Sequence, residues 1–148
     1  MTLATSEVIV NQVTGMPLGF PIGVPGFEDH HGFMLGALGP EYGPYLGLMS
    51  TLEGGPGFVV VQPAEVGIEM TIDIDDFHQS LIGAEEEKDI LVLLVANVRD
   101  DGPPTVNTLA PIIINTKNWR CAQVIQKNAA CLLEQDVDVP LRDEARLS

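Results

Sequence analysis

Three histidines and their acidic neighbours are the residues of this chain that could carry chemistry. Glu28 and Asp29 directly precede His30 and His31, and His78 lies further along. Imidazole and carboxylate groups can hold a transition metal and activate water, as a metal-assisted hydrolase would require. However, the spacing matches none of the patterns HxH, HxxxH or HExxH, and adjacent histidines on a strand point to opposite faces. We therefore expect no metal and no cofactor, and we keep the hydrolase as an alternative.

The second candidate is a group of aspartates, Asp73, Asp75 and Asp76. Clustered carboxylates can perform acid–base catalysis or bind calcium. The calcium-loop pattern is not met, because Phe77 follows Asp76 and no glycine occupies the sixth position. An aspartate before a helix also caps its first turn without any catalytic role. Since the chain also lacks GxSxG and a phosphate-binding glycine loop, we predict a binding or regulatory protein and not an enzyme.

The charge of the chain is strongly acidic and unevenly distributed. Its 148 residues contain 21 Asp and Glu against 7 Lys and Arg, which gives a net charge of −14. Residues 1–87 contain no Lys or Arg at all. So few cations cannot replace the counterions of nucleic acid phosphates, and an anionic membrane surface would repel the protein. The charge instead favours basic protein partners, whose association it would accelerate.

The sequence predicts a cytoplasmic protein. No apolar run approaches the roughly 18 residues that span a bilayer. The first residues, MTLATSEVIV, lack the positive charge that begins a secretory signal. Cys121 and Cys131 are the two cysteines, and they form no CxxC pair. We expect both thiols to be reduced, with a disulfide between them as the alternative.

Apolar or alternating runs bounded by glycine and proline predict eight strands. They cover residues 6–13, 33–38, 45–50, 58–61, 69–73, 90–98, 106–116 and 121–126. Ile74, Phe77 and Leu81 recur at helical spacing and predict one short helix, capped by Asp73 or Asp75 and ended by Gly83. Because strands follow one another without crossover helices, we predict a mainly β fold: a small antiparallel β-barrel-like domain over residues 1–130 with one short helix. Residues 131–148 are polar and predicted to form a loose tail.

Residues 19–29, GFPIGVPGFED, combine prolines and glycines with large apolar side chains. Pro21 and Pro25 each fix φ, and Gly23 and Gly26 allow turns that other residues cannot make. This combination predicts a stiff corner. The apolar side chains of the corner are predicted to plug one end of the barrel: Phe20, Ile22, Val24 and Phe27.

Residues 20–29, FPIGVPGFED, resemble the F-P-x-G-[IL]-P-G-F-E motif of the flagellar assembly factor FliW family. Three further segments are similar to segments of that family and occur in the same order. They are FVVVQP at 58–63, DILVLLVANV at 89–98 and VNTLAPIIINTKNWRCAQVI at 106–125. The resemblance extends over roughly residues 5–126, but the C-terminal segment lacks the tyrosine and basic residues common in the family.

The resemblance implies a small antiparallel β-barrel-like protein that is not an enzyme. Members bind flagellin as a chaperone and bind the carbon storage regulator CsrA, an RNA-binding protein, which relieves repression of flagellin translation. A small-ligand-binding barrel with an apolar cavity is the alternative. For partner binding we expect the acidic cluster and a strand edge, because a proline in a strand indicates an edge that can receive another strand. The residues of that expected edge are Asn107, Pro111, Ile112 and Asn115.

Overall fold

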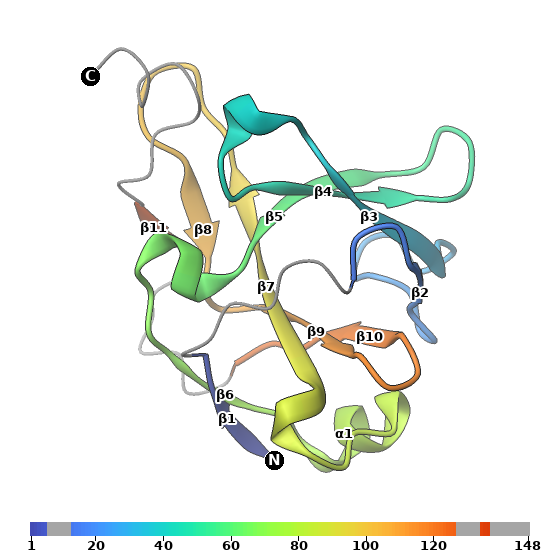
Figure 1. The fold of residues 1–148 in the computed structure, drawn as a ribbon. Helices are drawn as coiled ribbons and strands as arrows, with labels where there is room; N and C mark the ends of the chain where they lie inside the picture. The colour runs from blue at the N-terminus through green and yellow to red at the C-terminus, as the bar shows by residue number, and fades with distance from the viewer. Residues whose placement is uncertain (6–12, 127–133, 137–148) are drawn as a thin grey trace.

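The computed structural model describes residues 1–5, 13–126 and 134–136 (Figure 1). Most of the predicted strand 6–13 and most of the predicted tail 131–148 therefore lie outside the described residues. In the described part of the chain, no helix has the length and apolar character needed to cross a membrane.

The centre of the structure is a closed barrel, to which seven strands contribute among the described residues. Their order around the barrel is β7-β5-β4-β3-β2-β10-β9, and β9 pairs again with β7. The strands are β2 (Pro17–Gly19), β3 (Gly32–Ala37), β4 (Leu46–Ser50), β5 (Gly57–Val61), β7 (Ile90–Asn97), β9 (Ile112–Asn115) and β10 (Arg120–Gln123). The prediction of a mainly β, barrel-like domain with one short helix is confirmed. One pairing departs from it, because β10 runs parallel to β2, with Arg120 opposite Gly19.

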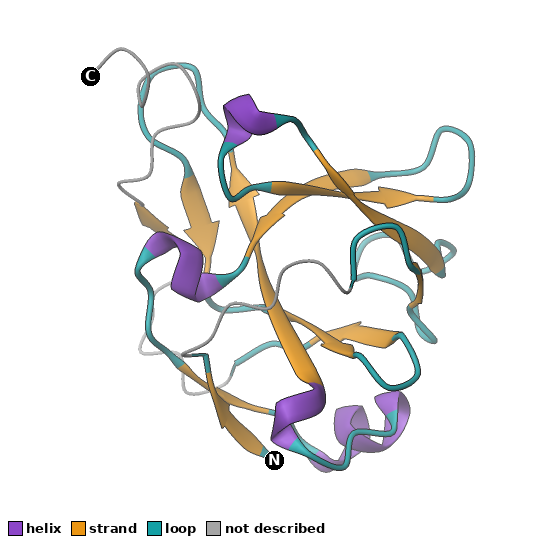
Figure 2. Ribbon diagram, in the orientation of Figure 1, coloured by secondary structure: helices purple, strands orange, loops and turns teal. Residues whose placement is uncertain are grey.

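The remaining elements surround the barrel or, like β8, extend its sheet (Figure 2). β1 (Thr2–Ala4) pairs with β6 (Thr71–Asp73), and β8 (Thr105–Asn107) pairs with both β7 and β11 (Glu134–Asp136). The helix α1 (Asp76–Ile82) packs against β10. The described residues also form three short 3-10 helices: η1 (Pro40–Tyr42), η2 (Pro63–Val66) and η3 (Glu87–Asp89).

The barrel interior is filled by apolar side chains. β7 supplies Leu91 and Leu93 to it, whereas Ile90 and Val92 point outward, as the two-residue period of a strand requires. Aromatic and aliphatic side chains from the other strands and from the 19–29 segment fill the rest. The buried cluster is Val13, Leu18, Phe20, Val24, Phe33, Leu35, Leu48, Val60, Leu91, Leu93, Ile112, Ile114 and Cys121.

Two outer faces of the barrel are also covered. Ile90 and Val92 of β7 pack with Ile113 of β9 beneath α1 and the β1–β6 pair. Further along β7, Leu94 and Ala96 pack with side chains from β5, β8 and the segments around η1 and η2. β7 is therefore buried on both faces, which explains why its sequence is an unbroken apolar run.

Two predicted elements differ from the structure. The predicted strand 106–116 is two strands, β8 and β9, because Asn107 turns the chain between them: its Oδ1 accepts the backbone N–H groups of Leu109 at 2.9 Å and Ala110 at 3.3 Å. The predicted helical stripe is wrong at Phe77, which is 59% exposed. Ile82 is the residue of α1 that reaches the core.

Tyr45 allows a test of this packing through pH. The side chain is 1% exposed, and its hydroxyl has no hydrogen-bond partner among the described residues. Burial raises the pKa of Tyr45 to about 12, compared with about 10 in an unfolded chain. The unfolded chain releases the Tyr45 proton at a lower pH than the folded protein does. The free energy of unfolding therefore keeps its full value below about pH 10 and falls as the pH rises towards 12.

We expect Tyr45→Phe to keep wild-type stability at pH 7, because no hydrogen bond within the described structure is removed. Between pH 10 and pH 12 the variant should lose less stability than the wild type, by up to about 2 kcal/mol. Urea denaturation at a series of pH values measures both effects. If the wild type and the variant lost the same stability between pH 10 and pH 12, ionisation of Tyr45 would not be the cause of the loss.

Candidate protein-binding surface

The acidic cluster lies where β6 passes into α1. Asp75 is the N-cap of α1, and its Oδ1 accepts the backbone N–H of His78 at 2.8 Å and lies 2.7 Å from the Nδ1 of the same residue. Asp76 occupies the first turn, where a negative charge complements the helix dipole. Gly83 ends the helix with φ at 68°. The cap and the end of the helix are therefore as the sequence predicts.

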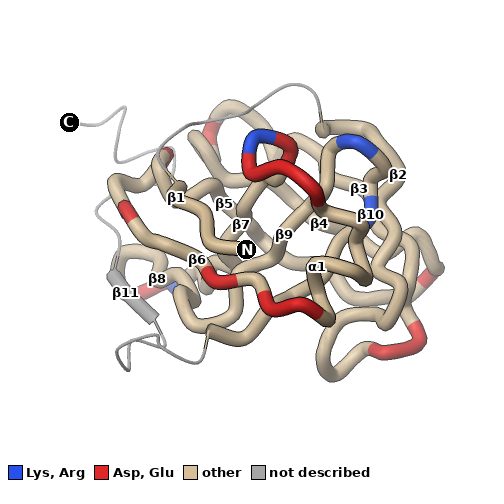
Figure 3. Tube along the Cα trace, turned by 90° about the horizontal axis from the view of Figure 1, so that it is seen from below, with Lys and Arg blue, Asp and Glu red and all other residues tan. Residues whose placement is uncertain are grey.

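Asp73 lies at the end of β6 and is held through both its side chain and its backbone. Thr2 Oγ1 donates to Asp73 Oδ1 at 2.9 Å. The side-chain amide of Gln126 accepts from the Asp73 N–H at 2.9 Å and donates to the Asp73 carbonyl at 3.1 Å. Sequence reasoning missed Gln126, which holds the backbone of Asp73 in addition to the pairing of β6 with β1. Asp73, Asp75 and Asp76 are all exposed, and acidic positions lie on either side of the buried Ile74 where β6 passes into α1 (Figure 3).

Asn115 fixes the other end of α1. Asn115 Nδ2 and Asn118 Nδ2 each donate a hydrogen bond to the Ile82 carbonyl at 2.9 Å. Asn115 Oδ1 accepts the Lys117 N–H at 3.0 Å. Asn115 is 2% exposed. These bonds tie the turn between β9 and β10 to the helix that carries the aspartates. Asn115 therefore anchors the C-terminal end of the helix whose other end carries Asp75 and Asp76, and nothing in its sequence context identified this contact.

The predicted strand edge at Asn107–Asn115 is wrong. β9 pairs with β10 on one side and with β7 on the other, so it offers no free edge along Ile112–Asn115. Pro111 and Ile112 are buried, and Asn107 forms the turn described above. The predicted partner contacts at Asn107, Pro111, Ile112 and Asn115 lose the argument that supported them.

The 19–29 segment closes one end of the barrel with only part of its apolar residues. Phe20 and Val24 are 0% and 3% exposed within the barrel cluster, whereas Ile22 and Phe27 are 46% and 42% exposed. A plug formed by all four side chains is therefore wrong. The backbone turns tightly here, with Gly23 at φ 73°. A Cβ on Gly23 would lie 2.6 Å from the Glu28 carbonyl oxygen.

A further turn in the same segment is fixed by a charge. The Gly26 N–H donates to the Glu28 carboxylate at 2.9 Å. This hydrogen bond lowers the pKa of Glu28 below its ordinary value. The glutamate therefore stabilises the loop as a local acceptor, and Gly26, at φ 89°, uses the backbone region that glycine adopts readily.

The three histidines do not converge. The Nδ1 of His30 lies 3.0 Å from Ser50 Oγ, the Nδ1 of His31 lies 2.9 Å from the Phe20 carbonyl oxygen, and His78 contacts Asp75. Within residues 1–5, 13–126 and 134–136, no group of three His, Cys, Asp or Glu side chains could hold a metal ion. The hydrolase alternative therefore gains no support from the arrangement of its proposed ligands.

The environment of Cys121 differs from that of a reactive thiol. Cys121 is a free thiol inside the barrel, and burial raises its pKa. A thiol in this environment is protonated and inert at neutral pH. Cys131 lies outside the described residues, so the predicted state of that thiol stays a prediction.

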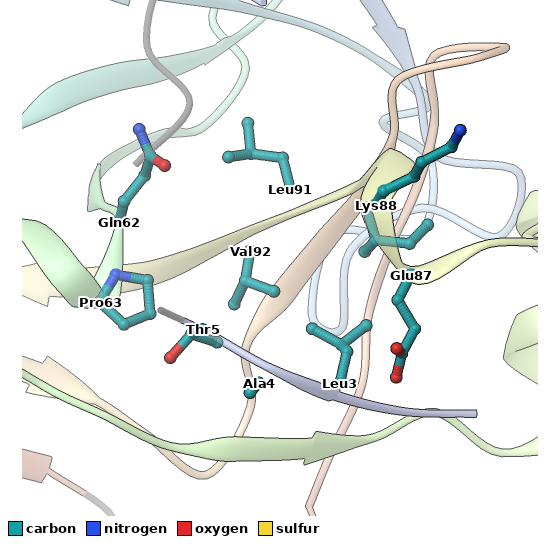
Figure 4. Close-up of a pocket in the computed structure, with 10 residues that line it drawn as sticks. Leu3, Ala4, Thr5, Gln62, Pro63, Glu87, Lys88, Leu91 and Val92 are labelled. Atoms are coloured by element: carbon teal, nitrogen blue, oxygen red, sulfur yellow. The ribbon is translucent and has the colours of Figure 1, made fainter. Parts of the chain in front are cut away.

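A cavity of about 290 Å³ lies between β1 and β7 (Figure 4). Figure 4 shows residues of β1 and Thr5 on one side, Leu91 and Val92 of β7 behind them, and Gln62 with Pro63 at one end. Glu87 and Lys88 line the other end. This mixed lining differs from the apolar cavity expected of a small-ligand barrel. Thr5 is also the last described residue before the gap at residues 6–12.

The sequence is similar to those of one protein family over most of its length. A family model described as FliW protein matches residues 2–137. Flagellar assembly factor FliW of Treponema denticola is 30% identical over 125 residues, which cover 84% of each chain. The protein of the same name from Leptospira biflexa is 33% identical over 113 residues, covering 75% of this chain and 73% of its own.

The fold agrees with a solved structure. A crystal structure of the flagellar assembly factor FliW superimposes with a TM-score of 0.73 at 26% sequence identity. The superposition covers 92% of this chain and 96% of the other. The similarity therefore extends over almost the whole of both proteins and includes the barrel.

Proposed function

This chain belongs to the FliW family, and from that membership we propose that it serves flagellar assembly by binding other proteins and not by catalysing a reaction. The observation that carries the proposal is the family match over residues 2–137. The inert thiol and the separated histidines agree with a role that needs no catalytic centre.

We further propose two partners, flagellin and the regulator CsrA, and a cytoplasmic location in which both are met. The charge distribution supports the second partner. A regulator that binds RNA carries positive charge around its RNA site, and a chain of net charge −14 would attract it. Once docked, the acidic chain places a negative field where the RNA phosphates approach, which weakens RNA binding even without covering the site.

Binding measurements with each purified partner test this proposal. We expect the chain to bind flagellin and CsrA separately, and we expect flagellin to compete with CsrA. Addition of the chain should release a labelled leader RNA from CsrA, and the release should weaken as salt is raised. Absence of binding to both partners would overturn the proposed function, whereas salt-independent release of RNA would replace the electrostatic mechanism with steric blocking.

The acidic cluster gives a sharper prediction. We expect the combined substitutions Asp73→Asn, Asp75→Asn and Asp76→Asn to slow association with CsrA about tenfold at low salt, and the difference should shrink at high salt. Asparagine caps helices about as well as aspartate, so α1 should remain folded. Stopped-flow association at several salt concentrations measures the effect.

The matched control removes the same number of charges from the segment after α1, by Glu85→Gln, Glu86→Gln and Glu87→Gln. These glutamates are exposed, and the ion pair between Glu86 and Lys88 at 3.1 Å lies at the surface, where it contributes little to stability. A smaller loss in the control would locate the interface at Asp73–Asp76. An equal loss in both variants would show that only the total charge matters, and the cluster would then have no special role.

A further inference from the structure

One outer face of the barrel is left bare by the elements that cover the others. Strand pairing aligns Pro17 of β2 with Met34 of β3, Met34 with Met49 of β4, and Met49 with Gly57 of β5. We call these four residues the methionine row. Met34 and Met49 are 42% and 53% exposed. Large apolar side chains thus stand next to each other at the surface.

The row continues beyond β5. Continuing the β5–β7 register by two residues past Val59 and Ala96 would place Val98 opposite Gly57, and Val98 is 40% exposed. A Cβ on Gly57 would lie 2.5 Å from Met49 Sδ, so the missing side chain lets Met49 lie over β5. The row crosses β2, β3, β4 and β5 and follows the curvature of the barrel wall.

The positions around the row on β2 to β5 are uncharged, and the exposed Arg120 of β10 pairs with Gly19 at one margin. A sheet with one face in water normally alternates apolar residues inward with polar residues outward. On β2 to β5 the inward positions are apolar apart from Ser50, and the outward positions also lack charge. They are Pro17, Gly19, Gly32, Met34, Gly36, Gly47, Met49, Gly57 and Val59; Gly47 is buried and Val59 packs against the covered cluster on β7. In a chain of net charge −14, an uncharged sheet face of this kind indicates an interface and not a solvated surface.

We infer that the methionine row is a docking surface for the apolar stripe of an amphipathic helix whose margins are basic. The inference rests on the proposed function, because the helix belongs to the flagellar subunit that this chain would hold before assembly. A subunit that polymerises carries apolar assembly surfaces that must be covered until then. Methionine side chains suit this task, since they are unbranched and adapt to irregular apolar partners.

Charge selects this occupant over a second copy of the chain. The described charged residues within 17–61 are all acidic: Glu28, Asp29, Glu41 and Glu53. Lysine or arginine at the margins of the helix would face these carboxylates favourably, whereas acidic margins would be repelled. Two copies of this chain, each with a net charge of −14, would likewise repel each other across the row.

Methyl NMR of methionine tests the inference directly. Protein labelled with ¹³C at its methionine methyl groups is titrated with purified flagellin, and separately with two designed amphipathic peptides. The peptides share one leucine stripe and differ in having lysine or glutamate margins. We expect flagellin and the lysine peptide to shift the methyl signals of Met34 and Met49. The signal of Met70, which packs against the covered faces, should remain in place, and the glutamate peptide should shift none of these.

A pair of exposed substitutions gives the second readout. We expect Met49→Glu to weaken flagellin binding by about tenfold or more, since it places a charge in a buried apolar contact. Phe77→Glu is the control, because Phe77 is 59% exposed on α1, away from the row, and its binding should equal that of the wild type. Both positions are exposed, so the melting temperatures should stay close to wild type.

The outcomes separate this inference from the proposed function. If flagellin binds but neither methyl signal moves and Met49→Glu binds normally, the docking site is wrong and the proposed function stands. If flagellin does not bind the wild type, the proposed chaperone role fails. The docking surface is then tested by the lysine peptide alone, and it is wrong if that peptide leaves the methyl signals of Met34 and Met49 unshifted. Methyl shifts that depend on the concentration of the protein alone would identify a second copy as the occupant and overturn it.

Discussion

Replacing Phe20 by alanine is expected to lower the free energy of unfolding by about 3–5 kcal/mol. Phe20 is 0% exposed and meets Phe33 edge to face, with ring centroids 5.1 Å apart. The side chain lies where the 19–29 segment enters the barrel, surrounded by strands that are paired on both sides. The cavity left by the ring cannot collapse easily there, so the cost should lie in the upper part of the range for core substitutions.

Ile22→Ala is the matched control for this experiment. Ile22 belongs to the same turn and was predicted to share the same role, but its side chain is 46% exposed. Its truncation should cost less than about 1 kcal/mol. Denaturant unfolding of both variants measures the contrast. Similar losses at the two positions would show that the whole segment, and not Phe20 alone, contributes to the barrel core.

The second large effect is expected at Gly23. Alanine there would have to adopt φ near 73° and would also place its Cβ 2.6 Å from the Glu28 carbonyl oxygen. The backbone of the turn must therefore move, because a carbonyl of the same tight loop cannot rotate away like a long side chain. We expect Gly23→Ala to lower the free energy of unfolding by more than about 2 kcal/mol.

Gly26→Ala separates the two causes of that effect. Gly26 also has a positive φ, 89°, but a Cβ there would meet no atom within 4 Å. Its substitution therefore costs only the backbone strain of the left-handed region, about 1 kcal/mol. Thermal unfolding of the two variants gives the comparison. If Gly26→Ala proves as costly as Gly23→Ala, the close approach to Glu28 contributes nothing and strain alone explains both.

Much of the fold could be predicted because the decisive signals are local. The run over residues 90–97 is apolar at every position but its last, and such a run buried on both faces forms the central strand. Asp75 and Gly83 mark the ends of α1 through their own side-chain and backbone chemistry. Proline and glycine residues in the turns likewise mark where the strands begin and end.

The failures concern contacts that depend on distant residues. Asn107 interrupts the predicted strand 106–116 by accepting bonds from the residues that follow it, and Pro111 belongs to that interruption, not to an exposed edge. Asn115 looked like a binding residue, but its amide caps a helix more than thirty residues away in the sequence. Helical spacing also suggested a buried Phe77, although a helix of seven residues buries little more than its last turn.

The candidate surface was the hardest to predict for the same reason. Met34 and Met49 each lie in strands that were correctly expected, and singly each is an ordinary exposed apolar residue. They form a surface only through the register of strand pairing, which aligns them with residues of the neighbouring strands in one row. The acidic cluster, by contrast, is contiguous in the sequence, and its exposed position could be anticipated before the fold was known.

The parallel contact between Gly19 and Arg120 completes the barrel wall, and almost all of the barrel sequence lies between these two residues. During synthesis, β10 leaves the ribosome after β2 and all the barrel strands between them, so the wall cannot close until Gln123 has been made. Until then Phe20 and its neighbours have no complete enclosure. We therefore expect incomplete chains of this protein to expose the apolar interior of the barrel and to be prone to aggregation.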